Sequence, residues 1–190
     1  MINIPRTASL ALCAATFATA QVTKIDVFKP TTPRDDSKAN SPEVPDVYAI
    51  SGDIKRVVVL RFKYQADLLA GLEKMVKEQK IKNAVILSGI GSVRNYHLHS
   101  VSSRTFPSKN TYYKDPSAPA DIISMNGYVI GGRLHPHMTL TTGEKAFGGH
   151  LEPGTNVFTF AIVTLGVLGD DVDLSKVDDI SVLRHDRWSP

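Results

Sequence analysis

The sequence predicts an α+β fold, a largely antiparallel β-sheet or barrel with one main helix. Only residues 68–76 carry apolar side chains at helical spacing, whereas several apolar runs of strand length are spread over residues 57–168. A strong hairpin-turn signal between two of these runs favours antiparallel neighbours. A chain of 190 residues, with 42% hydrophobic and 22% charged residues, suits one such domain with appendages.

Residues 1–20 are typical of a secretory signal peptide. Arg6 is the single charged residue before a small and apolar run from Ala8 to Ala18, and Ala18-Thr19-Ala20 matches an Ala-x-Ala cleavage site. We therefore expect a periplasmic or secreted mature protein. Cys13 is the one cysteine in the sequence, so the mature chain would hold none, and a metal ion would need histidine or carboxylate ligands.

Residues 21–46 are predicted to form a flexible, proline-rich linker, and residues 47–190 to form the domain itself. The linker segment is polar, lacks apolar periodicity and contains four prolines. The alternative for its first part is a strand around Val22 to Phe28.

The first part of the domain predicts the order strand, helix, strand. Residues 57–60 are a continuous apolar run, which suggests a strand covered on both faces. Asp67 stands at the start of the helix, whose apolar stripe consists of Leu68, Leu69, Leu72, Met75 and Val76. Residues 84–87 predict a second buried strand. The Gly89-Ile90-Gly91 that follows lacks a third glycine and precedes strand-like alternation, so a dinucleotide-binding Rossmann turn is excluded.

The second half predicts mainly strands. Residues 102–120 are expected to form a loop because three prolines lie among polar residues. Strands are expected at residues 122–125 and 128–130, joined by a hairpin turn at Asn126-Gly127. A long apolar strand is expected at residues 157–168, and a short terminal strand at residues 180–183.

Three of the six histidines, His135, His137 and His150, lie in one segment. Residues two apart on a strand share a face, so His135 and His137 project together. If the chain reverses at Thr142-Gly143, paired residues have numbers that sum to 285, and His150 stands opposite His135. Three imidazoles then converge on one face and apolar partners meet on the other. This pattern predicts a site for zinc or another divalent ion at these three histidines.

Solvated strand histidines are the alternative interpretation of this segment. Pro136 donates no ladder hydrogen bond, which suggests a sheet edge or a bulge at this point. His97 and His99 form a second His-x-His motif, and whether they contribute ligands stays open. Glu144 and His97 are candidate proton shuttles, but no general base follows from the spacing, so the catalytic residues and any enzymatic activity are left unassigned.

Residues 48–188 resemble the PPC domain, a family found in plants and prokaryotes. The motifs that carry the resemblance are residues 86–92, residues 122–127 and, above all, His135-x-His137 with the segment Gly148-Gly149-His150-Leu151. The resemblance implies an α+β fold that assembles as a homotrimer. In prokaryotic members it also implies a zinc ion on histidines matching His135, His137 and His150. We therefore expect an exported, metal-binding PPC-domain protein with a small ligand still to be identified and no membrane span.

Two other functions are alternatives. Plant members of the family bind AT-rich DNA through an AT-hook with an Arg-Gly-Arg core, which this sequence lacks. A formal charge of +3 does not by itself indicate a nucleic-acid partner either, so DNA is not the partner we expect. A cupin-like metalloenzyme is the other alternative, because the first cupin motif also contains His-x-His. The cupin motif also requires a glutamate after the second histidine, and this sequence has Thr141 and Thr142 at about that place.

Overall fold

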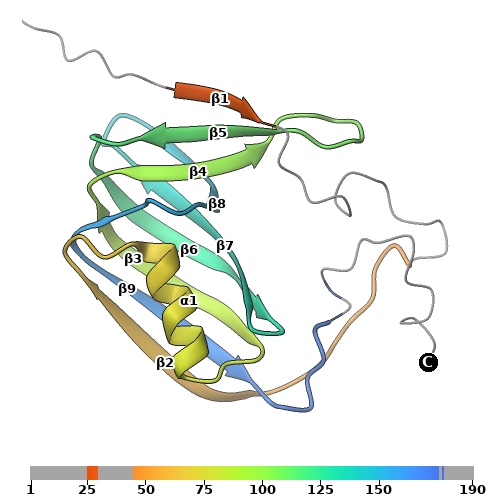
Figure 1. The fold of residues 1–190 in the computed structure, drawn as a ribbon. Helices are drawn as coiled ribbons and strands as arrows, with labels where there is room; N and C mark the ends of the chain where they lie inside the picture. The colour runs from red at the N-terminus through yellow and green to blue at the C-terminus, as the bar shows by residue number, and fades with distance from the viewer. Residues whose placement is uncertain (1–24, 30–44, 176, 178–190) are drawn as a thin grey trace, which may run out of the picture.

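The computed structural model describes residues 25–29, 45–175 and 177, which form one curved sheet of nine strands and a single helix (Figure 1). The strand order is β1-β5-β4-β8-β7-β6-β3-β9-β2. Every pairing is antiparallel, so the predicted α+β class with a largely antiparallel sheet is confirmed.

The first elements in chain order are β1 (Ile25–Lys29), β2 (Ile54–Lys63), α1 (Leu68–Glu78), β3 (Ala84–Val93) and β4 (Tyr96–Val101). They are followed by β5 (Asn110–Asp115), β6 (Ala120–Ile130), β7 (Arg133–Thr141), β8 (Ala146–Leu151) and β9 (Val157–Leu168). In the part of the chain that the structure describes, no helix has the length and apolar character needed to cross a membrane.

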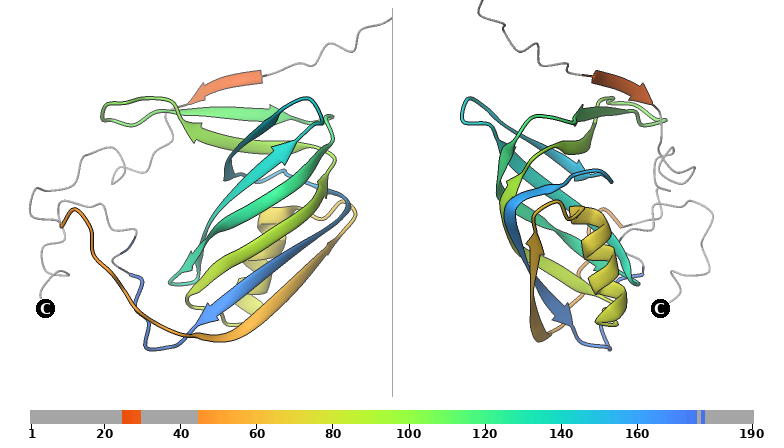
Figure 2. Two further views of the ribbon diagram at one scale, coloured as in Figure 1. Left: turned by 180° about the vertical axis from the view of Figure 1, so that it is seen from behind. Right: turned by 60° about the vertical axis from the view of Figure 1, so that its left-hand side comes forward.

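Helix α1 lies against one face of the sheet (Figures 1 and 2). Asp67 caps its N-terminus, because the carboxylate accepts a hydrogen bond from the backbone N–H of Ala70. The predicted apolar stripe is confirmed, and its most deeply buried members are Leu68, Leu72 and Val76. They belong to the same core as Leu60 and Phe62 of β2 and the inward side chains of β3, β4, β6, β7, β8 and β9.

No helix of the described residues covers the other face of the sheet, which we call the outer face. Val57 is 57% exposed and Val59 64% exposed, whereas Leu60 is only 6% exposed. Leu87 of β3 is exposed as well. The expectation that residues 57–60 and 84–87 are covered on both faces is therefore wrong for the single chain, because α1 covers one face only.

Strand β6 runs without interruption from Ala120 to Ile130, so the predicted turn at Asn126-Gly127 is wrong. The chain reverses at Gly131-Gly132 instead, where φ is 56° and 80°, as a type I′ turn requires. Gly127 has a φ of 132° and lies opposite Pro136, and a Cβ at Gly127 would collide with the backbone carbonyl oxygen of His135. Glycine is needed at this position for the close approach of β7.

Residues 102–120 contain β5, so the prediction of a loop throughout this segment is wrong. Hydrogen bonding to β4 and β1 makes Asn110–Asp115 a strand although it lacks a long apolar run. Strand β1 lies in the segment predicted to be a linker, at the place of the alternative strand. The predicted signal peptide, the rest of the linker up to residue 44 and the predicted strand at residues 180–183 lie outside the described residues.

Candidate metal centre

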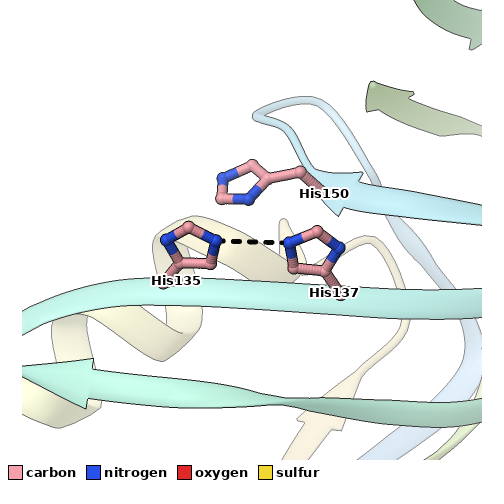
Figure 3. Close-up of side chains that lie close together, drawn as sticks. All are labelled: His135, His137 and His150. Atoms are coloured by element: carbon pink, nitrogen blue, oxygen red, sulfur yellow. Dashed lines mark hydrogen bonds between the residues drawn. The ribbon is translucent and has the colours of Figure 1, made fainter. Parts of the chain in front are cut away.

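Three histidine side chains converge on the outer face between β7 and β8 (Figure 3). His135 and His137 project from β7, and His150 projects from β8. One ring nitrogen from each lies within 4.8 Å of the other two, and the ring centroids are 5.0 to 5.3 Å apart. Among the described residues, this is the one group of three such side chains close enough to share a metal ion.

Three imidazoles are a donor set that zinc accepts, and the spacing of one pair of nitrogens matches such an ion. Zinc binds histidine nitrogens at about 2.0–2.1 Å with tetrahedral angles, so two ligand nitrogens on one ion lie about 3.3 Å apart. The Nε2 atoms of His135 and His137 are 3.3 Å apart. Three imidazoles would leave a fourth coordination position open.

The pairing of β7 with β8 differs from the predicted register by two residues. Paired residue numbers sum to 287, so His150 lies opposite His137 and not opposite His135. The turn is centred on Gly143-Glu144, and Gly143 has the positive φ, 86°, that a type II′ turn places at its first central residue. A shift of two residues keeps every side chain on its face, so the three histidines still converge.

Close backbone packing sets the position of His150. A Cβ at Gly148 would collide with the carbonyl oxygen of Met138 on β7, and one at Gly149 would collide with that of His99 on β4. Strand β8 therefore fits between its neighbours because these two residues are glycines. Pro136 lies just beyond the end of the β7–β8 ladder, so β7 is locally an edge on that side, as the missing N–H suggested.

Burial and the neighbouring histidines favour neutral rings in the site. Burial, and then repulsion of the charged form by His99, His135 and His137, together lower the pKa of His150 from 6.5 to about 4. The pKa of His137 is lowered by the same causes, burial first and then His135 and His99. Neutral imidazole is the form that binds a metal ion.

The metal-free protein is expected to lose stability as the pH falls from about 7 to about 4. The pKa of His150 is about 4 in the folded chain against an ordinary 6.5, so in this window the unfolded chain binds more protons. The contribution of His150 to the free energy of unfolding is therefore complete above 6.5, its pKa in the unfolded chain. It declines as the pH falls towards the pKa of the folded chain. Urea unfolding at several pH values measures this dependence, and His150→Gln should flatten it. An equally steep decline in the variant would contradict the assignment to His150.

The second histidine motif lies beside the three-histidine group. The His99 ring packs between the rings of His150 and Tyr112, with centroid distances of 4.8 Å and 5.2 Å. His99 Nδ1 forms a hydrogen bond with the Glu152 carboxylate, which fixes the orientation of the ring. His97 also packs on Tyr112, but its Nδ1 lies 3.0 Å from the Pro153 carbonyl oxygen. Neither His97 nor His99 contributes a ring nitrogen to the converging group of three.

Glu152 is a neighbour of the site that the sequence reasoning missed. It follows His150 by two residues and therefore shares its face, so the spacing could have pointed to it. Glu144, considered above as a proton shuttle, lies in the hairpin turn six residues before His150. At 3.3 Å per residue this separation is about 20 Å, too far for it to act at the site of its own chain.

Comparison with known proteins gives both a family match and structural neighbours. The model of the Plants and Prokaryotes Conserved (PCC) domain matches residues 49–169. A metal-containing protein of Archaeoglobus fulgidus superimposes with a TM-score of 0.54 at 24% identity, over 65% of this chain and 86% of that one. A plant- and prokaryote-conserved (PPC) protein of Pyrococcus horikoshii gives 0.50 at 23% identity, over 68% of this chain and 88% of that one.

Two further proteins are similar to the chain, one in structure and one in sequence. A candidate DNA-binding protein of Bacteroides thetaiotaomicron superimposes with a TM-score of 0.50 at 18% identity, over 63% of this chain and 83% of that one. In sequence, the chain is 27% identical over 111 residues to the bifunctional protein GlmU of a Synechococcus species. That alignment covers 58% of this chain but only 17% of the relative. The structural similarities, all below 25% identity, concern the fold alone.

Proposed function

Because the chain belongs to the Plants and Prokaryotes Conserved domain family, we propose that it is a metal-binding member that holds zinc through His135, His137 and His150. The observation that carries the proposal is the convergence of three ring nitrogens within 4.8 Å on one face. A structural neighbour described as metal-containing supports it. The bound ion would supply Lewis acidity at its open coordination position. The role of the three histidines is to hold it with neutral nitrogen ligands.

Elemental mass spectrometry of the purified, untagged protein tests this function. We expect close to one zinc ion per chain, and its loss from a His135→Ala/His137→Ala double variant that keeps its circular dichroism spectrum. No metal in either protein, even after zinc loading at neutral pH where imidazoles are unprotonated, would refute the proposal.

The proposal includes assembly as a homotrimer. The outer faces of β2, β3 and β9 carry exposed apolar side chains, a feature typical of association surfaces, and these include Val57, Val59, Ile90, Phe158 and Phe160. Light scattering coupled to size exclusion should give three times the mass of the mature chain. A monomer across the working concentration range would remove the trimer from the proposal.

The proposal also includes export to the periplasm or the medium, and this part rests on the sequence alone. The mature chain is expected to begin at Gln21 after cleavage of residues 1–20. Intact mass spectrometry of the protein from cell fractions tests this, and an uncleaved chain confined to the cytoplasm would contradict it.

DNA binding is the competing function, because one structural neighbour is described as a candidate DNA-binding protein. It predicts retention on DNA-cellulose with a steep decrease in affinity as the salt concentration rises. The formal charge of +3 does not favour it. The absence of retention at physiological salt would leave metal binding as the proposed function.

A further inference from the structure

An open pocket of about 420 Å³ adjoins the three-histidine group on the outer face. His135 and His137 form part of its lining, so a ligand in the pocket could also reach an ion held by these residues. Apolar side chains make up most of the rest, and these are Val85, Ile86, Ile130 and Val177. The volume lies within the range of small-molecule sites, about 300–1,000 Å³.

Strand pairing places two polar side chains between the histidines and the apolar wall. Asn126 of β6 lies directly opposite His137, and Tyr128 of β6 lies directly opposite His135. Directly opposed residues have Cβ atoms about 4.5–5.5 Å apart. Within the described part of the chain, neither the Asn126 amide nor the Tyr128 hydroxyl has a hydrogen-bond partner. Both groups are therefore available to a ligand.

The charge of the site selects the polar end of the ligand. Neutral imidazoles add no negative charge, so a divalent ion on them would keep its full charge and favour an anionic fourth ligand such as a carboxylate. None of the described residues that line the pocket is lysine or arginine. A phosphate would leave several charged oxygens without partners against the apolar wall, whereas a carboxylate would place its charge at one end.

We propose that this pocket binds a small carboxylic acid with an apolar body, its carboxylate directed to the ion and its body against Val85 and Tyr128. Asn126 and the Tyr128 hydroxyl would hydrogen-bond to the carboxylate or to a polar group beside it. The inference rests on the proposed function, because the histidines must hold an ion for the carboxylate to be recognised.

Calorimetric titration of the zinc-loaded full-length protein with benzoate and with acetate tests the inference. Acetate carries the same charged group without the ring, so burial of the ring should make benzoate bind at least about tenfold more tightly. The metal-free protein should bind neither acid measurably. Metal content is measured on the same samples, so a failure to take up zinc would refute the proposed function before any acid is added.

Tyr128→Ala and Ile123→Ala form a matched pair of variants on β6. Tyr128 is 46% exposed and lines the pocket, whereas Ile123 is 52% exposed and does not. Tyr128→Ala should abolish most of the preference for benzoate over acetate while the zinc content stays unchanged, and Ile123→Ala should keep the preference. Equal affinity for both acids in a zinc-loaded wild-type protein would overturn the inference and leave the metal site standing. Benzoate binding of equal strength without zinc would also overturn it.

Discussion

Replacement of His150 by alanine is expected to lower the affinity for zinc by more than about 100-fold. Loss of a residue that only supports a metal ligand typically costs 10–100-fold in affinity, so loss of a ligand should cost more. His150 is the one ligand of the three that β8 supplies. Without it, the two remaining ring nitrogens both come from β7. Competition between the protein and a fluorescent chelator measures the dissociation constant.

The second histidine motif supplies graded controls for this measurement. His99→Ala removes a ring that packs on His150, so we expect a loss of about tenfold, the lower end of the effect of supporting residues. His97→Ala, on the same strand and against the same tyrosine, should leave the affinity unchanged. A His150→Ala protein that folds and binds zinc as tightly as the wild type would exclude His150 as a ligand.

Replacement of Gly127 by alanine is expected to lower the free energy of unfolding by about 3 kcal/mol. Its φ of 132° is a conformation that residues with a side chain rarely adopt, and a Cβ would collide with the His135 carbonyl oxygen. Strands β6 and β7 would have to move apart, and β7 carries two of the three histidines. Urea unfolding monitored by circular dichroism measures the change.

Gly131→Ala is the matched control for this variant. Gly131 also has a positive φ, 56°, but no atom lies within 4 Å of the position that a Cβ would take. The expected cost is therefore that of a left-handed conformation alone, about 1 kcal/mol. Equal costs at both positions would contradict the close approach of β7 to Gly127. The same result would favour the hairpin turn that the sequence suggested for Asn126-Gly127.

The outcome at Gly127 illustrates why sequence patterns misplace turns. An Asn-Gly pair between apolar runs is a local signal for a hairpin, and Gly131-Gly132 is another such signal five residues later. In the structure the second pair forms the turn. The role of the first pair depends on contact of Gly127 with Pro136 and with the backbone of His135. These two residues lie eight or more positions from Gly127 in the sequence, so no local pattern includes them.

Short stretches of sequence were sufficient to predict helix α1 and the common face of the three histidines. The helix follows from an apolar stripe and the Asp67 cap within twelve residues, and the common face follows from a period of two along each strand. A register error of two residues did not disturb that face, because it moves each side chain by a whole period.

The residues that surround the histidines, in contrast, depend on how the strands pair in the folded chain. Pairing of β4 with β8 brings His99 next to His150, and pairing of β6 with β7 brings Tyr128 next to His135. The exposed outer face likewise depends on where α1 packs. The physical reason is that these contacts join strands whose pairing is set by packing of the whole sheet, and no periodicity within a single strand encodes its neighbour.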